Sequence, residues 1–131
     1  MIDDVLETNE LFYAAFAERD LDRMESLWCV EQTPTCVHPG WPPIRGRAEV
    51  LESLRAIFAG GGLAPTCEAP TLQSVGDVGI VLCRERLGAA VLVATNVFVR
   101  EEGAWRLLHH HASAVAQVPE TPPLDPELMP N

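Results

Sequence analysis

Basic residues are scarce in this sequence. Lys and Arg account for 9 of its 131 residues, Asp and Glu account for 19, and the formal net charge is −10 at pH 7. Nucleic acids and anionic membrane surfaces are both bound by clustered Lys and Arg. We therefore expect neither a nucleic acid nor a membrane as a partner of this protein.

Long apolar runs are missing as well. No run approaches the roughly 20 residues that a membrane-spanning helix needs, and the acidic start at residues 1–4 is unlike a signal peptide. Hydrophobic residues make up 47% of the chain, which is typical of a globular domain rather than a disordered chain. The length predicts one domain, and we expect it in the cytoplasm.

The cysteines show no paired spacing. The four cysteines, Cys29, Cys36, Cys67 and Cys83, form no C-x-x-C motif and lie in apolar surroundings. Such residues behave as small hydrophobic side chains, so we expect buried free thiols in a reducing compartment. A disulfide framework or a zinc site is the alternative. No nucleophile constellation, phosphate loop or dinucleotide fingerprint is present, and we expect no cofactor.

Helical spacing dominates the first half of the chain, and strand-like segments dominate the second half. Three helices are predicted, one from a capping box formed by Asp4 and Glu7, one after Asp20, and one over 46–59. Strands are predicted at 35–38, 66–75, 78–87, 89–100 and 105–116. Helices segregated from strands predict an α+β fold, with three N-terminal helices packed on one face of a curved antiparallel sheet. We expect a domain at 1–117 and a tail at 118–131 that holds five prolines.

The predicted strand at 89–100 is apolar on both faces. Alternation puts four valines on one face and Leu92, Ala94 and Phe98 on the other. Both faces must therefore be covered. Three helices can cover one face, so we expect a second copy of the chain to cover the other, giving a homodimer through the sheet.

Three motifs follow one another along the chain. Residues 12–28 hold a Phe-Tyr helix followed by R-D-L-D and L-W, residues 38–47 read H-P-G-W-P-P-I-R-G-R, and residues 105–113 read W-R-L-L-H-H-H-A-S. In this order they resemble the nuclear-transport-factor-2-like superfamily, in particular its SnoaL-like branch. The resemblance implies a cone in which helices close one side of the curved sheet around an internal cavity. The last motif is also similar to a strand of the association domain of calcium/calmodulin-dependent protein kinase.

The middle motif is similar to a segment of ketosteroid isomerase, which belongs to the same superfamily. By this resemblance, His38 takes the place of a general-base aspartate, and Asn96 takes the place of a protonated aspartate in the oxyanion hole. Phe12 and Trp28 stand where that enzyme has two tyrosines, the first of which is a hydrogen-bond donor. Tyr13 lies about 100° further around the helix and is no obvious substitute. The resemblance thus implies the fold and the place of the pocket, but not steroid isomerisation.

Three consecutive histidines, residues 109–111, lie in the last predicted strand. Strand alternation places His109 and His111 on one face, and His110 on the other together with Arg106 and Leu108. The resemblance implies that His110 points into the cavity. His109 and His111 could hold a metal ion as an H-x-H pair, but no carboxylate is near them in the sequence, and we predict no metal site.

These observations give a candidate site. The candidate catalytic residues are His38, Asn96 and His110, because imidazoles suit proton transfer near neutral pH and a buried amide can donate to an oxyanion. The candidate ligand-binding residues are Tyr13, Trp28, Trp41, Leu54, Phe58 and Arg106. For each candidate the alternative is structural: a hydrogen-bonded wall histidine, an amide bonded to backbone, or plain core.

Two kinds of function fit the sequence. The first is a cofactor-free enzyme for proton transfer, such as isomerisation, cyclisation, dehydration or hydrolysis, on a small apolar or carbonyl-containing ligand. The second is a non-catalytic module that binds a small molecule or assembles like the kinase association domain.

Overall fold

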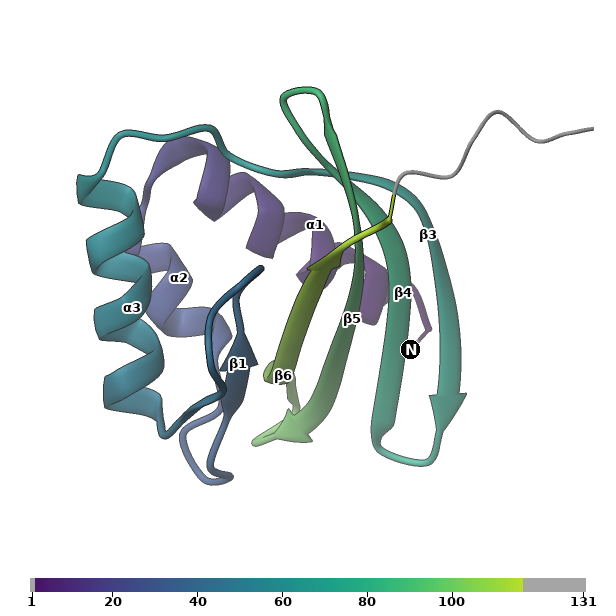
Figure 1. Cartoon of the computed structure of the whole chain (residues 1–131). Coiled ribbons are helices and arrows are strands. Elements are labelled where there is room, and N and C mark those ends of the chain that lie inside the picture. The colour runs from purple at the N-terminus through teal and green to yellow at the C-terminus, as the bar shows by residue number, and fades with distance from the viewer. Residues whose placement is uncertain (1, 117–131) are drawn as a thin grey trace, which may run out of the picture.

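The computed structural model of the chain describes residues 2–116, and the side chains among them from Val5 onward. Within this range the chain forms three helices and six strands, and Figure 1 shows their arrangement. The helices are α1 (Ile2–Glu18), α2 (Leu21–Leu27) and α3 (Arg47–Ala59), and the strands are β1 (Thr35–Val37), β2 (Ile44–Arg45), β3 (Thr66–Val75), β4 (Val78–Leu87), β5 (Ala90–Glu101) and β6 (Ala104–Ala114). The predicted tail at 118–131 lies outside the described residues.

The three predicted helices are confirmed, with one change at the N-terminus. Because α1 begins at Ile2, Asp4 lies inside its first turn, and the prediction that a capping box at Asp4 starts the helix is wrong. Neither of the two preceding residues is a helix breaker, so nothing local stops the helix from extending. Asp20 caps α2, since its Oδ1 accepts a 3.0 Å hydrogen bond from the backbone N–H of Arg23. Such a cap pairs a donor that the helix leaves free.

The six strands form one sheet in the order β2-β1-β6-β5-β4-β3. The meander from β3 to β6 is antiparallel, as predicted. However, β1 and β6 are parallel, with Cys36 opposite His110, so the sheet is mixed, whereas the sequence analysis expected an antiparallel sheet. The alternation of apolar and polar residues in a strand does not show whether the strand pairs parallel or antiparallel with a strand that is distant in sequence. This parallel pair brings the end of β1 next to the histidines of β6.

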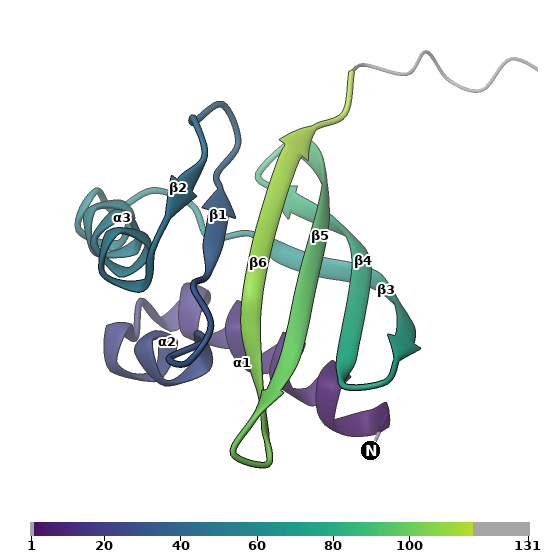
Figure 2. The ribbon, with the colours of Figure 1, turned by 90° about the horizontal axis from the view of Figure 1, so that it is seen from below.

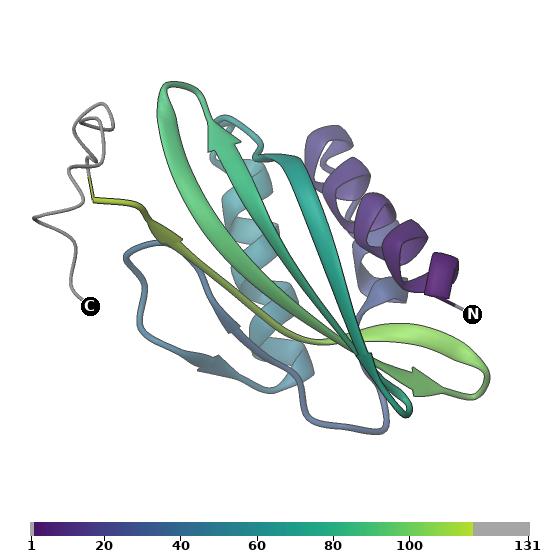
Figure 3. The ribbon, with the colours of Figure 1, turned by 90° about the vertical axis from the view of Figure 1, so that its right-hand side faces the viewer.

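All three helices lie on one side of the sheet. Figure 2 shows α1 crossing the long strands, and Figure 3 shows the strands in front of the helices. α1 contacts β3, β4 and β6, while α2 contacts β6. Fully buried side chains of both layers, among them Phe12, Trp28, Leu54 and Phe98, form the core between them.

The two faces of β5 differ in cover, as the sequence pattern predicts. Leu92, Ala94 and Phe98 are buried on the helix side. On the opposite face, which no described element covers, Val93 is 49% exposed and Leu82 of β4 is 52% exposed. An apolar outer face therefore runs along the middle of the sheet.

A β-bulge in β6 changes the predicted alternation of this strand. His109 pairs with Val97 whereas Leu107 pairs with Phe98, which leaves Leu108 without a partner on β5. One extra residue moves all preceding side chains to the other face. Leu107 is therefore fully buried in place of Leu108, and the prediction that Arg106 and Leu108 share the face of His110 is wrong.

Two expectations from composition concern cysteines and membranes. All four cysteines are free thiols, three of them buried and Cys67 partly exposed, which confirms the expectation of free cysteines. Within residues 2–116, no helix has both the length and the apolar character to cross a membrane.

Candidate functional site

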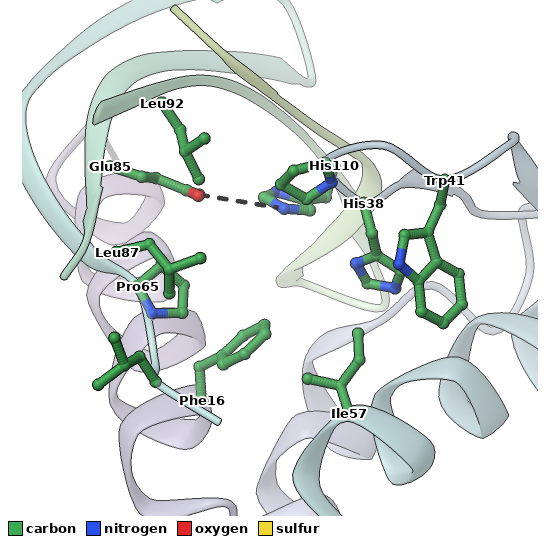
Figure 4. Close-up of a pocket in the computed structure, with 11 residues that line it drawn as sticks. Phe16, His38, Trp41, Ile57, Pro65, Glu85, Leu87, Leu92 and His110 are labelled. Atoms are coloured by element: carbon green, nitrogen blue, oxygen red, sulfur yellow. Dashed lines mark ion pairs between the residues drawn. The ribbon is translucent and has the colours of Figure 1, made fainter. Parts of the chain in front are cut away.

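A pocket of about 200 Å³ lies between the helices and the sheet. Three of its lining residues are titratable: His38 after β1, Glu85 on β4 and His110 on β6. The rest of the lining is apolar and consists of Phe16, Pro39, Trp41, Ile57, Leu63, Pro65, Leu87 and Leu92. Figure 4 shows Glu85 and His110 pointing toward each other, with His38 beside Trp41.

The turn after β1 positions His38 and Trp41. Gly40 has a φ of +81°, a left-handed conformation that glycine adopts without steric cost. The backbone N–H of Trp41 donates a 2.9 Å hydrogen bond to the carbonyl of His38. The turn thereby places the two rings edge to face, with their centroids 5.0 Å apart.

The tautomer of His38 follows from its partner Ser53 on α3. The Ser53 hydroxyl donates to the carbonyl of Val50 at 2.6 Å, so its oxygen accepts the 2.9 Å hydrogen bond from Nε2–H of His38. Nδ1 of the neutral ring then carries a lone pair. Burial disfavours the charged ring and lowers the pKa of His38 to about 4, so His38 is uncharged near neutral pH.

His110 is held between β5 and β4. Its Nδ1 lies 2.5 Å from Oδ1 of Asn96, and its Nε2 lies 4.0 Å from Oε2 of Glu85. The ring also packs against Phe12, with centroids 5.0 Å apart. Burial, followed by the charges of His38 and the neighbouring histidines, lowers the pKa of His110 to about 3. Near neutral pH this ring is also uncharged.

Glu85 is the functional candidate that the sequence analysis missed. Its side chain is nearly inaccessible, at 1% exposure, and its Oε2 accepts a 2.5 Å hydrogen bond from the Tyr13 hydroxyl. Burial raises the pKa of Glu85, and the Tyr13 hydrogen bond opposes part of that rise. The missed signal was periodicity, because Glu85 follows Val81 and Cys83 at alternate, inward positions of β4. A carboxyl group at such a position is rarely buried without a function or a partner.

Four side chains form a polar network at the wall of the pocket: Glu85 and His110 line the pocket, and Tyr13 and Asn96 lie behind them. The Tyr13 hydroxyl donates to Glu85 and accepts a 3.1 Å hydrogen bond from Nδ2 of Asn96. The same Nδ2 donates to Oδ1 of Asn9 at 2.9 Å. Both amide hydrogens of Asn96 are thus in use inside the protein, and Asn96 does not line the pocket.

The structure brings together some of the predicted site residues and separates others. His38, His110 and Trp41 line the pocket. Trp28 and Leu54 are fully buried in the core. Phe58 packs on Phe16 with ring centroids 5.3 Å apart and lines a smaller neighbouring hollow. Arg106 lies elsewhere, because its Nη1 donates to the carbonyl of Ser26 at the end of α2.

Tyr13 has a different place from the one that the sequence analysis implied. Phe12, which the resemblance to ketosteroid isomerase was expected to put in the place of a tyrosine donor, packs edge to face on Trp28 in the core. Tyr13 is the residue whose hydroxyl reaches the site, through Glu85. The sequence analysis gave Tyr13 as no obvious substitute for that donor, yet in the structure it is the residue that places a hydroxyl there. Burial, Glu85 and Cys83 raise the pKa of Tyr13, so it acts as a hydrogen-bond donor and not as a phenolate.

The H-x-H pair lies away from this pocket. The rings of His109 and His111 are 6.0 Å apart, and Nδ1 of His109 lies 2.6 Å from the Thr35 hydroxyl. In the part of the chain that the structure describes, no group of three or more His, Cys, Asp or Glu side chains is placed to hold a metal ion.

Comparison with known proteins agrees with this fold. The sequence model of the SnoaL-like domain matches residues 5–117. The chain is 33% identical to a proposed dehydratase of the NTF2-like family from Streptomyces avermitilis, over 88% of this chain and 96% of that one, with a TM-score of 0.83. It is 32% identical to a proposed calcium/calmodulin-dependent protein kinase type II association domain from Thiobacillus denitrificans, over 83% and 93% of the two chains, with a TM-score of 0.70.

Two further comparisons concern eukaryotic proteins. A calcium/calmodulin-dependent protein kinase II hub from S. rosetta has a TM-score of 0.71 at 22% identity, covering 87% of this chain and 96% of that one, which is a likeness of fold. The F-box protein SKIP8 of Arabidopsis thaliana is 26% identical over 115 residues, or 85% of this chain and 49% of the relative. The chain therefore spans about half the length of that curated relative.

Proposed function

The chain belongs to the SnoaL-like domain family, and on that premise we propose that it is an acid–base enzyme that moves protons on a small, apolar, uncharged carbonyl compound. The observation that carries the proposal is the pairing of Glu85 with His110 at 4.0 Å inside the pocket. Opposite pKa shifts in one apolar site are typical of an acid and a base that work together.

The pocket supports this class of substrate. At about 200 Å³, it is smaller than the ~300–1,000 Å³ typical of sites for drug-sized ligands. Its described lining holds no Lys or Arg, so a carboxylate or phosphate would lack a counter-ion there. A neutral compound with one polar end fits both the size and the lining.

In the proposed reaction, Glu85 and His110 act in one step. Nε2 of His110 removes the proton from the carbon next to the carbonyl, while the carboxyl proton of Glu85 passes to the carbonyl oxygen. The product of this step is a neutral enol, and the imidazolium and carboxylate left behind stabilise each other across the short gap. The Nδ1 lone pair of His38 accepts a hydrogen bond from a hydroxyl group of the substrate.

The enol can then react in two ways. If a carbon–carbon double bond is conjugated with the enol, His110 returns its proton to the far end of that double bond while the enol proton goes back to Glu85, and the product is an isomer with the double bond shifted. If the adjacent carbon carries a hydroxyl, that group leaves as water with the His110 proton, and the enol proton returns to Glu85. Both routes restore the starting protonation of the site, and the second is the type of reaction for which the Streptomyces protein is named.

We expect the protein to catalyse hydrogen–deuterium exchange next to the carbonyl of small ketones or aldehydes. Incubation of a panel of such compounds in D2O, followed by NMR, measures this exchange. His110→Gln should lower the rate by about 10²–10⁴-fold, the usual contribution of a positioned base, whereas the exposed His111→Gln control should keep it. A panel that exchanges no faster than with heat-denatured protein, or an unchanged rate in His110→Gln, would contradict the proposal.

We also propose that the protein self-associates through the outer face of its sheet. This face carries exposed apolar side chains such as Leu82 and Val93, and the similarity to a proposed association domain supports an assembling role. A non-catalytic assembly module is accordingly the second candidate function, and it does not exclude the first.

Charge on the outer face should break this association. Leu82→Arg places a cation in the middle of the apolar face, where a partner would have to bury it, so we expect a dimer to become a monomer. Val30→Arg changes an apolar residue outside the sheet that is even more exposed than Leu82, and it should leave the dimer intact. Light scattering gives the masses, and a monomeric wild type or a dimeric Leu82→Arg variant would refute the assignment.

A further inference from the structure

We infer that Asn96 is a positioning residue, which fixes the tautomer of His110 so that the Nε2 lone pair faces the pocket. Asn9 and Tyr13 hold the Asn96 amide in the one orientation that does this. The catalytic meaning of the inference rests on the proposed function, but the tautomer itself does not.

The first step is the direction of the hydrogen bond between β5 and β6. Oδ1 of Asn96 lies 2.5 Å from Nδ1 of His110, and an amide oxygen can only accept. Nδ1 of His110 therefore carries the ring proton. In a neutral ring the other nitrogen, Nε2, then has the free lone pair, and this is the nitrogen that lies 4.0 Å from Oε2 of Glu85.

The second step is that the Asn96 amide cannot turn around. Its Nδ2 lies 2.9 Å from Oδ1 of Asn9 and 3.1 Å from the Tyr13 oxygen, and the Tyr13 proton is already given to Glu85. A rotated amide would place its oxygen against these two oxygens with no proton between them, and would lose the contact with His110. Nδ2 of Asn9 donates to the sulfur of Cys67 at 3.6 Å, and this leaves Oδ1 of Asn9 to accept from Asn96.

The third step is that packing alone does not call for these amides. Asn9 on α1 is 1% exposed and Asn96 on β5 is 0% exposed, at positions where the surrounding core is apolar. A buried amide costs free energy unless every polar atom is paired. The network pairs each of these polar atoms. Oδ1 of Asn96 accepts a hydrogen bond from Nδ1 of His110, the ring nitrogen that faces away from Glu85.

The charge of the positioning group also matters. A carboxylate in place of the amide would favour the protonated imidazole and turn the base into an acid. A neutral amide orients the ring without that effect, so His110 keeps its lone pair near neutral pH. Asparagine meets both requirements. Aspartate orients the ring but carries a charge, and leucine is neutral but offers no acceptor to orient the ring.

The test is NMR of ¹⁵N-labelled histidine in the wild type and in Asn96→Asp, Asn96→Leu and Asn9→Leu. We expect His110 of the wild type to be protonated at Nδ1 only. Asn96→Leu should lose this preference, Asn9→Leu should weaken it, and Asn96→Asp should keep Nδ1–H while Nε2 gains a proton at higher pH than in the wild type. The signals of His111, outside the network, are the internal control, and if Asn96→Leu does not fold, the near-isosteric Asn96→Asp decides.

An Nε2–H tautomer in the wild type, or an unchanged tautomer and titration in the Asn96 variants, would overturn the inference. In the exchange assay, each Asn96 variant should lower kcat by about 10–100-fold with little change in KM, the range known for outer partners of functional histidines. The Asn96→Asp variant should also move the acid limb of the pH profile upward. If the tautomers are as expected but no compound exchanges, the proposed function fails and the positioning of His110 stands.

Discussion

Replacement of Glu85 by glutamine should leave the protein at least as stable as the wild type near neutral pH, while lowering the rate of carbon–hydrogen exchange by about 10²–10⁴-fold. Glutamine has nearly the same shape, and its amide oxygen can accept the Tyr13 hydrogen bond. It cannot give a proton to a carbonyl oxygen. A carboxyl group kept for stability would show the opposite behaviour, with loss of stability and little effect on rate.

The stability effect of Glu85 has a defined dependence on pH. Its pKa is raised in the folded protein above the ordinary 4.5, so below about pH 4.5 both folded and unfolded chains hold the proton and the burial costs least. As pH rises from there through the folded pKa, the unfolded chain loses the proton first, and the free energy of unfolding falls. Because glutamine does not titrate, the free energy of unfolding of Glu85→Gln should not show this fall.

Denaturant unfolding of both proteins across this pH range measures the effect. We expect the advantage of Glu85→Gln over the wild type to grow as pH rises and to vanish in acid. Glu25→Gln, which changes an exposed carboxylate on α2, is the matched control and should alter neither rate nor stability. A Glu85→Gln variant that is less stable near neutral pH and fully active would contradict the assigned role.

Acid should destabilise the fold through His38. In the folded protein burial lowers the pKa of His38 from 6.5 to about 4. Between these two values the unfolded chain binds more protons, so the free energy of unfolding falls as pH drops from 6.5 to about 4. At about 1.36 kcal/mol for each pKa unit, this loss is on the order of 3 kcal/mol.

The variant His38→Gln lacks this titration and should lose less stability over the same pH range. The titratable groups near His38 are the Cys36 thiol, at 3.7 Å from Nε2, and His110, whose ring centroid is 6.5 Å away. His110 remains in both proteins and acts in the same direction, so the difference between their unfolding curves reports His38. His111→Gln is the control for loss of an exposed histidine. If the free energy of unfolding fell equally in the wild type and in His38→Gln as the pH drops, burial would not lower the pKa of His38, and this role of His38 would be refuted.

Local sequence patterns were sufficient for most of the fold. Helical spacing and the Asp20 cap located α2, and alternation along β5 identified its buried face. Pro70 lies in β3, which is an edge strand of the sheet and has a register shift between Glu68 and Thr71, the two places where a sheet tolerates proline. The resemblance to the NTF2-like superfamily is also confirmed by the SnoaL-like domain match.

The site was harder to predict for two reasons. It depends on which face of a strand each side chain occupies, and on contacts between residues that are far apart in the sequence. The bulge at Leu108 reverses the alternation of β6, and a one-residue insertion leaves no mark in the local pattern. Asn96 was identified, but its direction depends on Asn9, which is 87 residues away in sequence. Glu85 could have been found, since a carboxyl group at an inward position of an alternating strand is itself a signal.

The central claim is that the pocket holds a carboxyl group that keeps its proton to unusually high pH, next to an imidazole that stays neutral. A ¹³C NMR titration of the Glu85 side-chain carbon, assigned by its absence in Glu85→Gln, tests this most directly. The account predicts a pKa of Glu85 above 4.5, with His110 neutral throughout the titration. Titration of Glu85 at or below 4.5 would mean that it is an ordinary carboxylate, and the proposed acid would be lost.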